Sequence, residues 1–150
     1  MASIYTPAQV AVAKEIWDFW RENKCSEIQA AAWCAMADGE SSFDPRVIGD
    51  HGAAYGLFQI HHNPRGKFAL QNLNIDIRHA TVAEQLHVAR WEITSGWQKH
   101  AWKRLLATET VEDAVAVLIS GYEMSAKQAR DIARRTVMAA HWLKEFGEVA

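Results

Sequence analysis

The chain contains 150 residues, of which 49% are hydrophobic and 23% are charged, and its formal net charge is −2. This length suits a single domain over residues 1–150, which can bury a core without a metal or a disulfide. The composition is too apolar for a disordered chain, and the lack of a basic excess argues against nucleic-acid binding. We therefore expect a globular, monomeric domain whose partner is not selected by charge.

The N-terminal segment and the cysteines bear on the cellular compartment. The segment MASIYTPAQVAVAKEIW lacks the basic region, long apolar run and small-residue cleavage site of a secretory signal. No stretch is long and apolar enough for a membrane helix, so we expect synthesis in the cytoplasm and no stable membrane insertion. Cys25 and Cys34 flank a helical pattern, and nine helical residues rise roughly 13 Å, farther than one disulfide reaches. Both are predicted to be free thiols.

The first forty residues predict two helices that begin in the same way. Each opens with a capping box, in which a hydroxyl residue is followed three positions later by glutamine: Thr6 with Gln9, and Ser26 with Gln29. Pro7 occupies the first helical position of the first helix, which should run to about Asn23. The second helix contains the nearly all-apolar stretch IQAAAWCAMA and is predicted to end at Gly39. Such a uniformly apolar helix belongs in the middle of the fold.

Residues 44–63 lose the helical period, and Pro45, Gly49, Gly52 and Gly56 separate short apolar runs, which is typical of a small β-hairpin flap. Helical patterns then return. The predicted segments cover residues 67–73, about 77 or 81 to 94, 96–107, 110 to about 120, and 125–146, the last ended by Gly147. The predicted fold is mainly α, within the α+β class, with one small flap.

Glu40 and Asp50 are the candidate chemical groups. Glu40 lies at the C-terminal end of the apolar helix, where the helix dipole disfavours a second negative charge, and Phe43, Tyr55 and Phe58 follow closely enough to desolvate it. Asp50 occupies a wetter, glycine-bounded turn and should stay ionised. A protonated acid beside an ionised carboxylate suits the cleavage of a glycosidic bond. The alternative is a solvated glutamate after a helix end and an ordinary turn aspartate.

The motifs around these two residues resemble those of known wall-degrading enzymes. The segment ESSFDP, residues 40–45, is similar to the catalytic motif of soluble lytic transglycosylases, and GLFQI, residues 56–60, resembles their Gly-Leu-Met-Gln-Ile. The segment GDHGAAYGLFQI is similar to an active-site segment of goose-type lysozymes. Phage tail lysozymes resemble the chain more closely, since they add a later Gln-x6-Glu helix and a Tyr-Glu motif followed by an Ala-Arg helix. Those residues here are Gln85, Glu92, Tyr122, Glu123, Ala129 and Arg130.

The resemblance implies a lysozyme-like fold in which the flap forms one wall of a groove for peptidoglycan glycan strands. It implies Glu40 as general acid and Asp50 as the second carboxylate, with no metal and no cofactor. Six residues are expected to contact substrate or to support Glu40: Ser41, Tyr55, Phe58, Gln59, His61 and Tyr122. Glu123 is expected to form an ion pair. The target then lies outside the membrane, so delivery requires holin-type release or a place in a virion, with phage tail proteins as possible partners.

The mode of cleavage has two alternatives. A single carboxylate can protonate the leaving oxygen while the 6-hydroxyl of the muramic acid attacks, which is transglycosylation. A second carboxylate such as Asp50 can orient water instead, which favours hydrolysis of the β-1,4 bond between N-acetylmuramic acid and N-acetylglucosamine. The chain departs from goose-type lysozymes at His61, where they have a further aspartate, and replaces the transglycosylase Ala-Tyr-Asn motif with the Tyr122 stretch. A virion component that binds glycan without cutting it is a further alternative.

The chain contains seven tryptophans, and aromatic faces stack on sugars. Helical spacing predicts that most of them are core residues: Trp17, Trp20, Trp33, Trp91 and Trp142. Trp97 and Trp102 are the two candidates for the groove, and the pattern does not choose between them. His51, His61 and His62 beside Asp50 lack the spacing of a zinc peptidase, so metal catalysis is not predicted.

Overall fold

The computed structural model describes residues 4–124 and 126–148. Capping boxes begin helices α1 (Pro7–Glu22), α2 (Glu27–Ser41) and α4 (Val82–Ser95), and in each the hydroxyl oxygen accepts a hydrogen bond from the backbone nitrogen three residues later. These side chains satisfy backbone donors that a helix start leaves unpaired. The helix starts at Thr6 and Ser26 are therefore confirmed.

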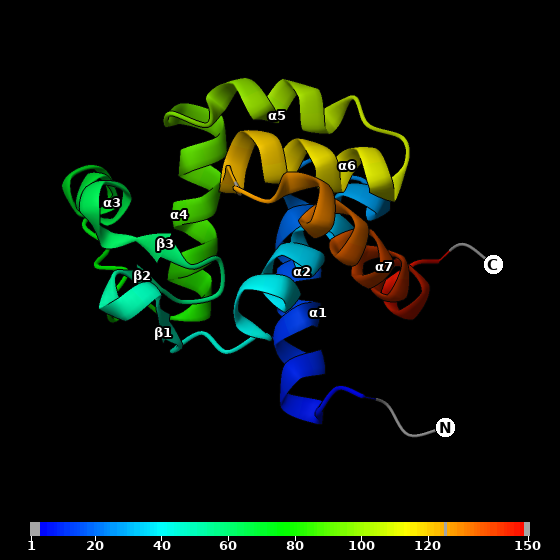
Figure 1. Cartoon of the computed structure of the whole chain (residues 1–150), viewed down its shortest axis with the longest axis horizontal. Coiled ribbons are helices and arrows are strands. Elements are labelled where there is room, and N and C mark those ends of the chain that lie inside the picture. Colours follow the sequence, from blue (N-terminus) through cyan, green and yellow to red (C-terminus); the bar gives the residue numbers. More distant parts are fainter. Residues whose placement is uncertain (1–3, 125, 149–150) are drawn as a thin grey trace.

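Helix α2 forms the centre of the fold, as its apolar sequence predicts. It packs against α1, α6 (Val111–Leu118) and α7 (Gln128–Phe146), and Figure 1 shows these helices around it. Its residues from Gln29 to Asp38 are all buried. The rings of Trp20 and Trp33 stack at a centroid distance of 4.0 Å between α1 and α2. The contact between these two rings is part of the main hydrophobic core.

The remaining helices follow the predicted order with shifted ends. Helix α3 (Lys67–Leu73) matches its predicted range, whereas α5 (Lys99–Leu106) begins after a bend that contains Gly96. Helix α6 continues into a single wider turn, η3 (Ile119–Glu123). The predicted start of the last helix, Ser125, lies outside the described residues, and α7 begins at Gln128.

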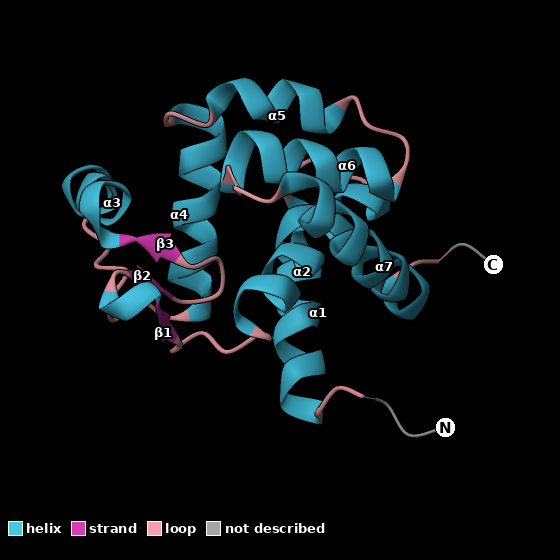
Figure 2. Cartoon of the chain, viewed as in Figure 1, coloured by secondary structure: helices cyan, strands magenta, loops and turns pink. Residues whose placement is uncertain are grey.

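The predicted flap is present but contains a third strand. Strands β1 (Ile48–Gly49), β2 (Ala54–Tyr55) and β3 (Ile60–His61) form an antiparallel sheet in that order, with Ile48 opposite Tyr55 and Tyr55 opposite Ile60. Figure 2 shows these strands on one side of the molecule, beside α3 and α4. Each strand contains only two residues, so the sheet needs support from the helices.

Gln85 of α4 supplies that support from a buried position. Its side-chain oxygen accepts a hydrogen bond of 2.8 Å from the Leu57 backbone, and its nitrogen donates to the Pro45 and Ala80 carbonyls at 2.8 and 3.0 Å. Gly56 has a φ of +78°, and a Cβ atom there would lie 2.3 Å from the Gln85 oxygen. Gly56 therefore permits both the turn and the close approach that fixes the flap to α4.

Cys25 and Cys34 are buried free thiols, which confirms the prediction made from their helical separation. Across residues 4–124 and 126–148, none of the helices combines the length and hydrophobicity that crossing a bilayer requires.

Candidate active site

Glu40 lies within the last turn of α2, so the prediction that Gly39 ends this helix is wrong. The helix continues to Ser41, and Ser42, with a φ of 52°, is the left-handed residue that terminates it. Gly39 has a different role, because a Cβ atom at this position would lie 2.5 Å from Nε of Arg135. The glycine is required because the Arg135 side chain crosses the surface of α2 on its way to Glu40.

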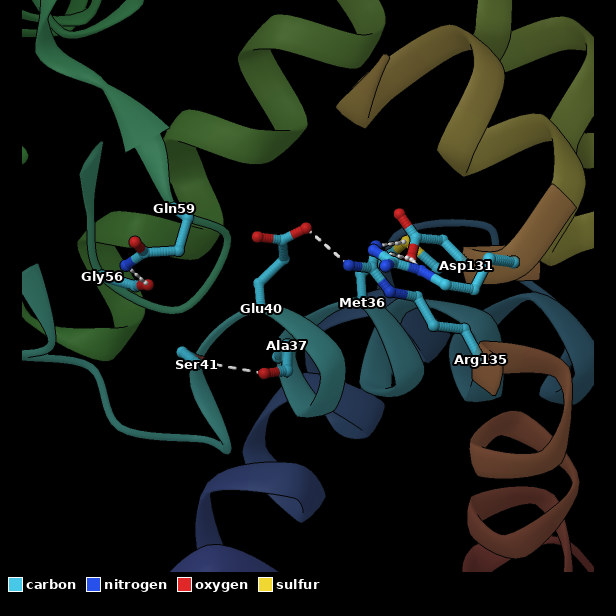
Figure 3. A network of polar contacts seen from close by, with 9 residues as sticks. Met36, Ala37, Glu40, Ser41, Gly56, Gln59, Asp131 and Arg135 are labelled. Atoms are coloured by element: carbon cyan, nitrogen blue, oxygen red, sulfur yellow. Dashed lines mark hydrogen bonds and ion pairs between the residues drawn. The ribbon is translucent and has the colours of Figure 1, made fainter. Parts of the chain in front are cut away.

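The Glu40 carboxylate forms an ion pair with Arg135 of α7. Nη2 of Arg135 donates to Oε1 of Glu40 at 2.5 Å, and Nη1 lies 3.4 Å from the Met36 sulfur. The Arg135 side chain is 8% exposed and that of Glu40 is 23% exposed, so the carboxylate remains accessible from one side. In Figure 3 it points away from α2, between Gln59 of the flap and Arg135. A guanidinium fixes the orientation of a carboxylate, and sequence reasoning missed this partner.

Two of the three aromatic residues expected to desolvate Glu40 are buried in the hydrophobic core. Phe43 is 2% exposed and packs edge-on against Trp142, and Phe58 is 1% exposed and packs edge-on against Trp33. Phe58 therefore offers no exposed face to a sugar, which corrects its predicted role, because burial of this ring in the core is more favourable than exposure. Tyr55 of β2 is half-buried and borders a separate cavity of about 600 Å³ beside residues 77–82.

Ser41 and Tyr122 also differ from the predicted arrangement. The buried Ser41 hydroxyl donates to the Ala37 carbonyl at 2.8 Å, one turn back along α2, as serine often does inside a helix. Tyr122 is 1% exposed, and its hydroxyl donates to Oε1 of Glu92 at 2.7 Å. Burial and the Glu92 charge raise the pKa of Tyr122, so the phenol stays protonated. The hydrogen bond of this phenol goes to Glu92 and not to Glu40.

The flap carries Asp50 and His61 as a pair. Oδ2 of Asp50 lies 3.1 Å from Nε2 of His61, and the two side chains are 56% and 48% exposed, respectively. Asp50 has a φ of 50°, a left-handed conformation that aspartate tolerates better than most residues. Gln59 uses its amide nitrogen inside the flap, donating to the Val47 and Gly56 carbonyls at 3.2 and 3.0 Å. The structure thus brings Asp50 and His61 together, while the Gln59 amide stabilises the flap itself.

Glu92 of α4 forms the centre of a buried polar network behind the site. Glu92 is 2% exposed, and its carboxylate accepts hydrogen bonds from Nε and Nη2 of Arg65 at 2.7 and 2.8 Å. It also accepts a hydrogen bond from the Tyr122 hydroxyl. The Arg65 guanidinium also lies 5.0 Å from the centre of the Tyr122 ring. The fork of two parallel hydrogen bonds is the strong, directional form of this ion pair. Sequence reasoning picked out Glu92 by resemblance but assigned it no role.

Glu123 is the second acidic group close to Glu40. It was expected to form an ion pair, but among the described residues its side chain forms none, and its buried Oε1 has no hydrogen-bond partner. Burial and the negative charge of Glu40 raise the pKa of Glu123 to about 8, against the opposing charges of Arg65 and Arg135. The Tyr-Glu motif marks Glu123 by resemblance, but its closeness to Glu40 depends on the packing of η3 against α6 and α7.

The raised pKa predicts that Glu123 makes stability depend on pH. The folded protein holds this proton up to a pH of about 8, whereas an ordinary glutamate releases it near 4.5. The contribution of Glu123 to stability is therefore full below pH 4.5 and is lost as the pH rises through 8. In thermal melts, Glu123→Gln should gain stability relative to wild type between pH 5 and 8. A difference in Tm that stays constant from pH 5 to 9 would contradict this assignment, and Glu145→Gln, on the exposed side of α7, should follow wild type.

A short antiparallel flap beside a helical core, with a glutamate in the last turn of the central helix, defines a protein of the lysozyme-like class. The family model described as phage tail lysozyme matches residues 11–146, and the chain belongs to this family. A search of curated proteins finds no match. Membership supports a phage-associated, lysozyme-like protein that acts on peptidoglycan, as the motifs around Glu40 predict.

Proposed function

We propose that this protein hydrolyses the β-1,4 bond between N-acetylmuramic acid and N-acetylglucosamine, with Glu40 as the general acid. The observation that carries the proposal is the position of Glu40. Its carboxylate is held by the buried Arg135, the Glu40 side chain remains 23% exposed, and it lies between Arg135 of α7 and Gln59 of the flap (Figure 3). An acid that is fixed in orientation and open on one side can donate to a glycosidic oxygen.

The Glu40 carboxylate forms an ion pair with Arg135, so the proton that catalysis consumes needs a source. Glu123 supports such a source, because burial and the charge of Glu40 raise its pKa to about 8. The raised pKa keeps Glu123 protonated at neutral pH, so Glu123 can supply a proton to the neighbouring Glu40. Glu40 is the more accessible member and delivers the proton to the leaving sugar oxygen. After the bond to the anomeric carbon breaks, the bonding electrons remain with that oxygen.

Asp50 completes the proposed reaction from the flap. A water molecule attacks the anomeric carbon and gives a proton to the Asp50 carboxylate, while His61, 3.1 Å from Asp50, holds the orientation of that carboxylate. Both side chains are about half exposed, so water reaches them freely. The product is a reducing sugar end.

Asp50→Asn should reduce lysis on the order of 10²-fold, because asparagine cannot accept a proton from water. The loss of turbidity of purified sacculi measures this effect. Asp44→Asn is the matched control, since Asp44 is an exposed loop residue that bonds only the nearby Arg46 backbone. If Asp50→Asn retains wild-type rates, water activation requires another residue.

Mass spectrometry of the products tests the reaction type. Reducing ends support hydrolysis, whereas 1,6-anhydromuramyl ends would replace the proposal with transglycosylation by Glu40 alone. Sacculi that bind the protein without releasing any fragment would identify a glycan-binding virion component. Family membership favours delivery as part of a virion over holin-type release, and wall binding by assembled particles would test that preference.

A further inference from the structure

A second concave surface lies where the bend between α4 and α5 faces α3. It encloses about 480 Å³ and is lined by Arg65, Phe68, Asn72, Trp97 and Lys99, among others. Its size falls within the range of small-ligand sites. The lining that the structure describes contains neither Glu40 nor Asp50, so this pocket is distinct from the proposed catalytic groups.

Trp97 gives the pocket an exposed aromatic face. It is 70% exposed, while Trp20, Trp33 and Trp142 are fully buried and Trp102 packs against Trp20. Its ring rests against Phe68 at a centroid distance of 5.1 Å. This contact holds the indole in place without covering its face, and a fixed aromatic face stacks on the apolar side of a sugar ring. Trp97, and not Trp102, is therefore the groove candidate.

Trp91 was expected in the core, but it is half-buried and lines the same pocket. Trp91 borders the pocket together with residues of the α4–α5 bend, so its side chain is not enclosed by the core.

The polar lining carries an unmatched positive charge. Arg65 is already neutralised by Glu92 through two hydrogen bonds. Lys99 and His100 are exposed, and within the described part of the chain neither lies within ion-pair distance of a carboxylate. Asn72 adds an amide that can donate and accept hydrogen bonds. An aromatic platform beside the free Lys99 cation fits a sugar whose substituent carries a carboxylate.

Electrostatic interactions link the pocket to the candidate active site. Arg65 and Glu92 border the pocket, and both also influence the pKa of Glu123, which lies close to Glu40. Both residues belong to the buried network that includes the Tyr122 hydroxyl. The pocket therefore lies beside the network that also affects a carboxyl group of the candidate active site.

We propose that this pocket binds a peptide-bearing muramic acid unit of the wall glycan, with Trp97 stacked on the sugar and Lys99 paired with a carboxylate of the stem peptide. The inference rests on the proposed function, since it assumes a glycan strand at Glu40. The proposed pocket adds a preference for peptidoglycan whose stem peptides are still attached.

Binding of the protein to purified sacculi tests the proposal. The assay is cosedimentation in the Glu40→Gln background, with intact sacculi and with the same sacculi after an amidase has removed the stem peptides. Trp97→Ala should weaken binding to both preparations by roughly tenfold. Lys99→Ala should weaken binding only to peptide-bearing sacculi, by about threefold, as expected for an exposed ion pair.

Two controls and two contrary outcomes complete the test. Val137→Ala removes an exposed apolar side chain on α7, and Lys103→Ala removes a cation of α5 outside the pocket; neither should change binding. Unchanged binding by Trp97→Ala would overturn the site. An equal effect of Lys99→Ala on both preparations would overturn the assignment to the stem peptide. Lysis that persists in Glu40→Gln contradicts the proposed function instead, so the two failures are distinguishable.

Discussion

Glu40→Gln is expected to abolish lysis of purified sacculi while the protein stays folded. Glutamine preserves the shape of the side chain, and its oxygen can still accept the hydrogen bond from Arg135 that Oε1 accepts at 2.5 Å. It cannot donate a carboxylic proton to the leaving sugar oxygen, and loss of such a group costs on the order of 10²- to 10⁴-fold in rate. Turbidity loss measures the rate, and a thermal melt reports the folded state.

Glu145→Gln provides the matched control for this variant. Glu145 also lies in the last turn of a helix, α7, but it is exposed and carries the same chemical change away from the site. It should retain the wild-type rate. Lysis by Glu40→Gln within tenfold of wild type would remove Glu40 from the proposed mechanism, whatever the result at Asp50.

Glu92→Gln should produce the largest loss of stability among single substitutions of charged residues. Glu92 is 2% exposed and neutralises Arg65, whose side chain is 16% exposed. Removing its charge leaves the guanidinium buried without a counter-ion, and such a loss typically costs about 3–5 kcal/mol. For a domain of this size, the melting temperature should fall by roughly 10 °C. Differential scanning calorimetry measures both quantities.

A second substitution separates the buried charge from lost packing. In the double variant Arg65→Met with Glu92→Gln, no uncompensated charge remains, so part of the lost stability should return. Glu15→Gln, an exposed change in α1, should match wild type. A cost below about 1 kcal/mol for Glu92→Gln would show that Arg65 finds water or another partner, and it would contradict the central role of Glu92.

The ion pair between Glu40 and Arg135 gives Glu40 surroundings that differ from those predicted from the sequence. Sequence reasoning expected an isolated acid that keeps its proton because of the helix dipole and nearby aromatic rings. The structure places those rings in the core and gives Glu40 a cation, while the proton-holding carboxyl group is Glu123. The pH profile of activity should therefore report a pair of carboxyl groups, not one isolated glutamate.

Local sequence features were sufficient to predict several parts of the structure. Capping hydroxyls at Thr6 and Ser26 predict where helices begin, because they satisfy backbone donors within three residues. The uniform apolarity of residues 28–37 places α2 at the centre, and glycine spacing places the flap. The Glu40 motif and its resemblance identified the family. Each of these features depends on neighbours in the sequence or on the total burial of one element.

Only the tertiary structure decided which groups meet. The sequence predicts that Gly39 ends a helix, whereas in the structure Arg135, 95 positions beyond Glu40, packs across it. The Tyr-Glu motif by itself does not predict the charge interaction between Glu123 and Glu40. Phe58 and Tyr122 lie in sequence motifs that fit a glycan groove. Both side chains are nevertheless buried by helices distant in the chain. Charge interactions and burial depend on distance in space, and the packing of α6 and α7 against α2 sets those distances.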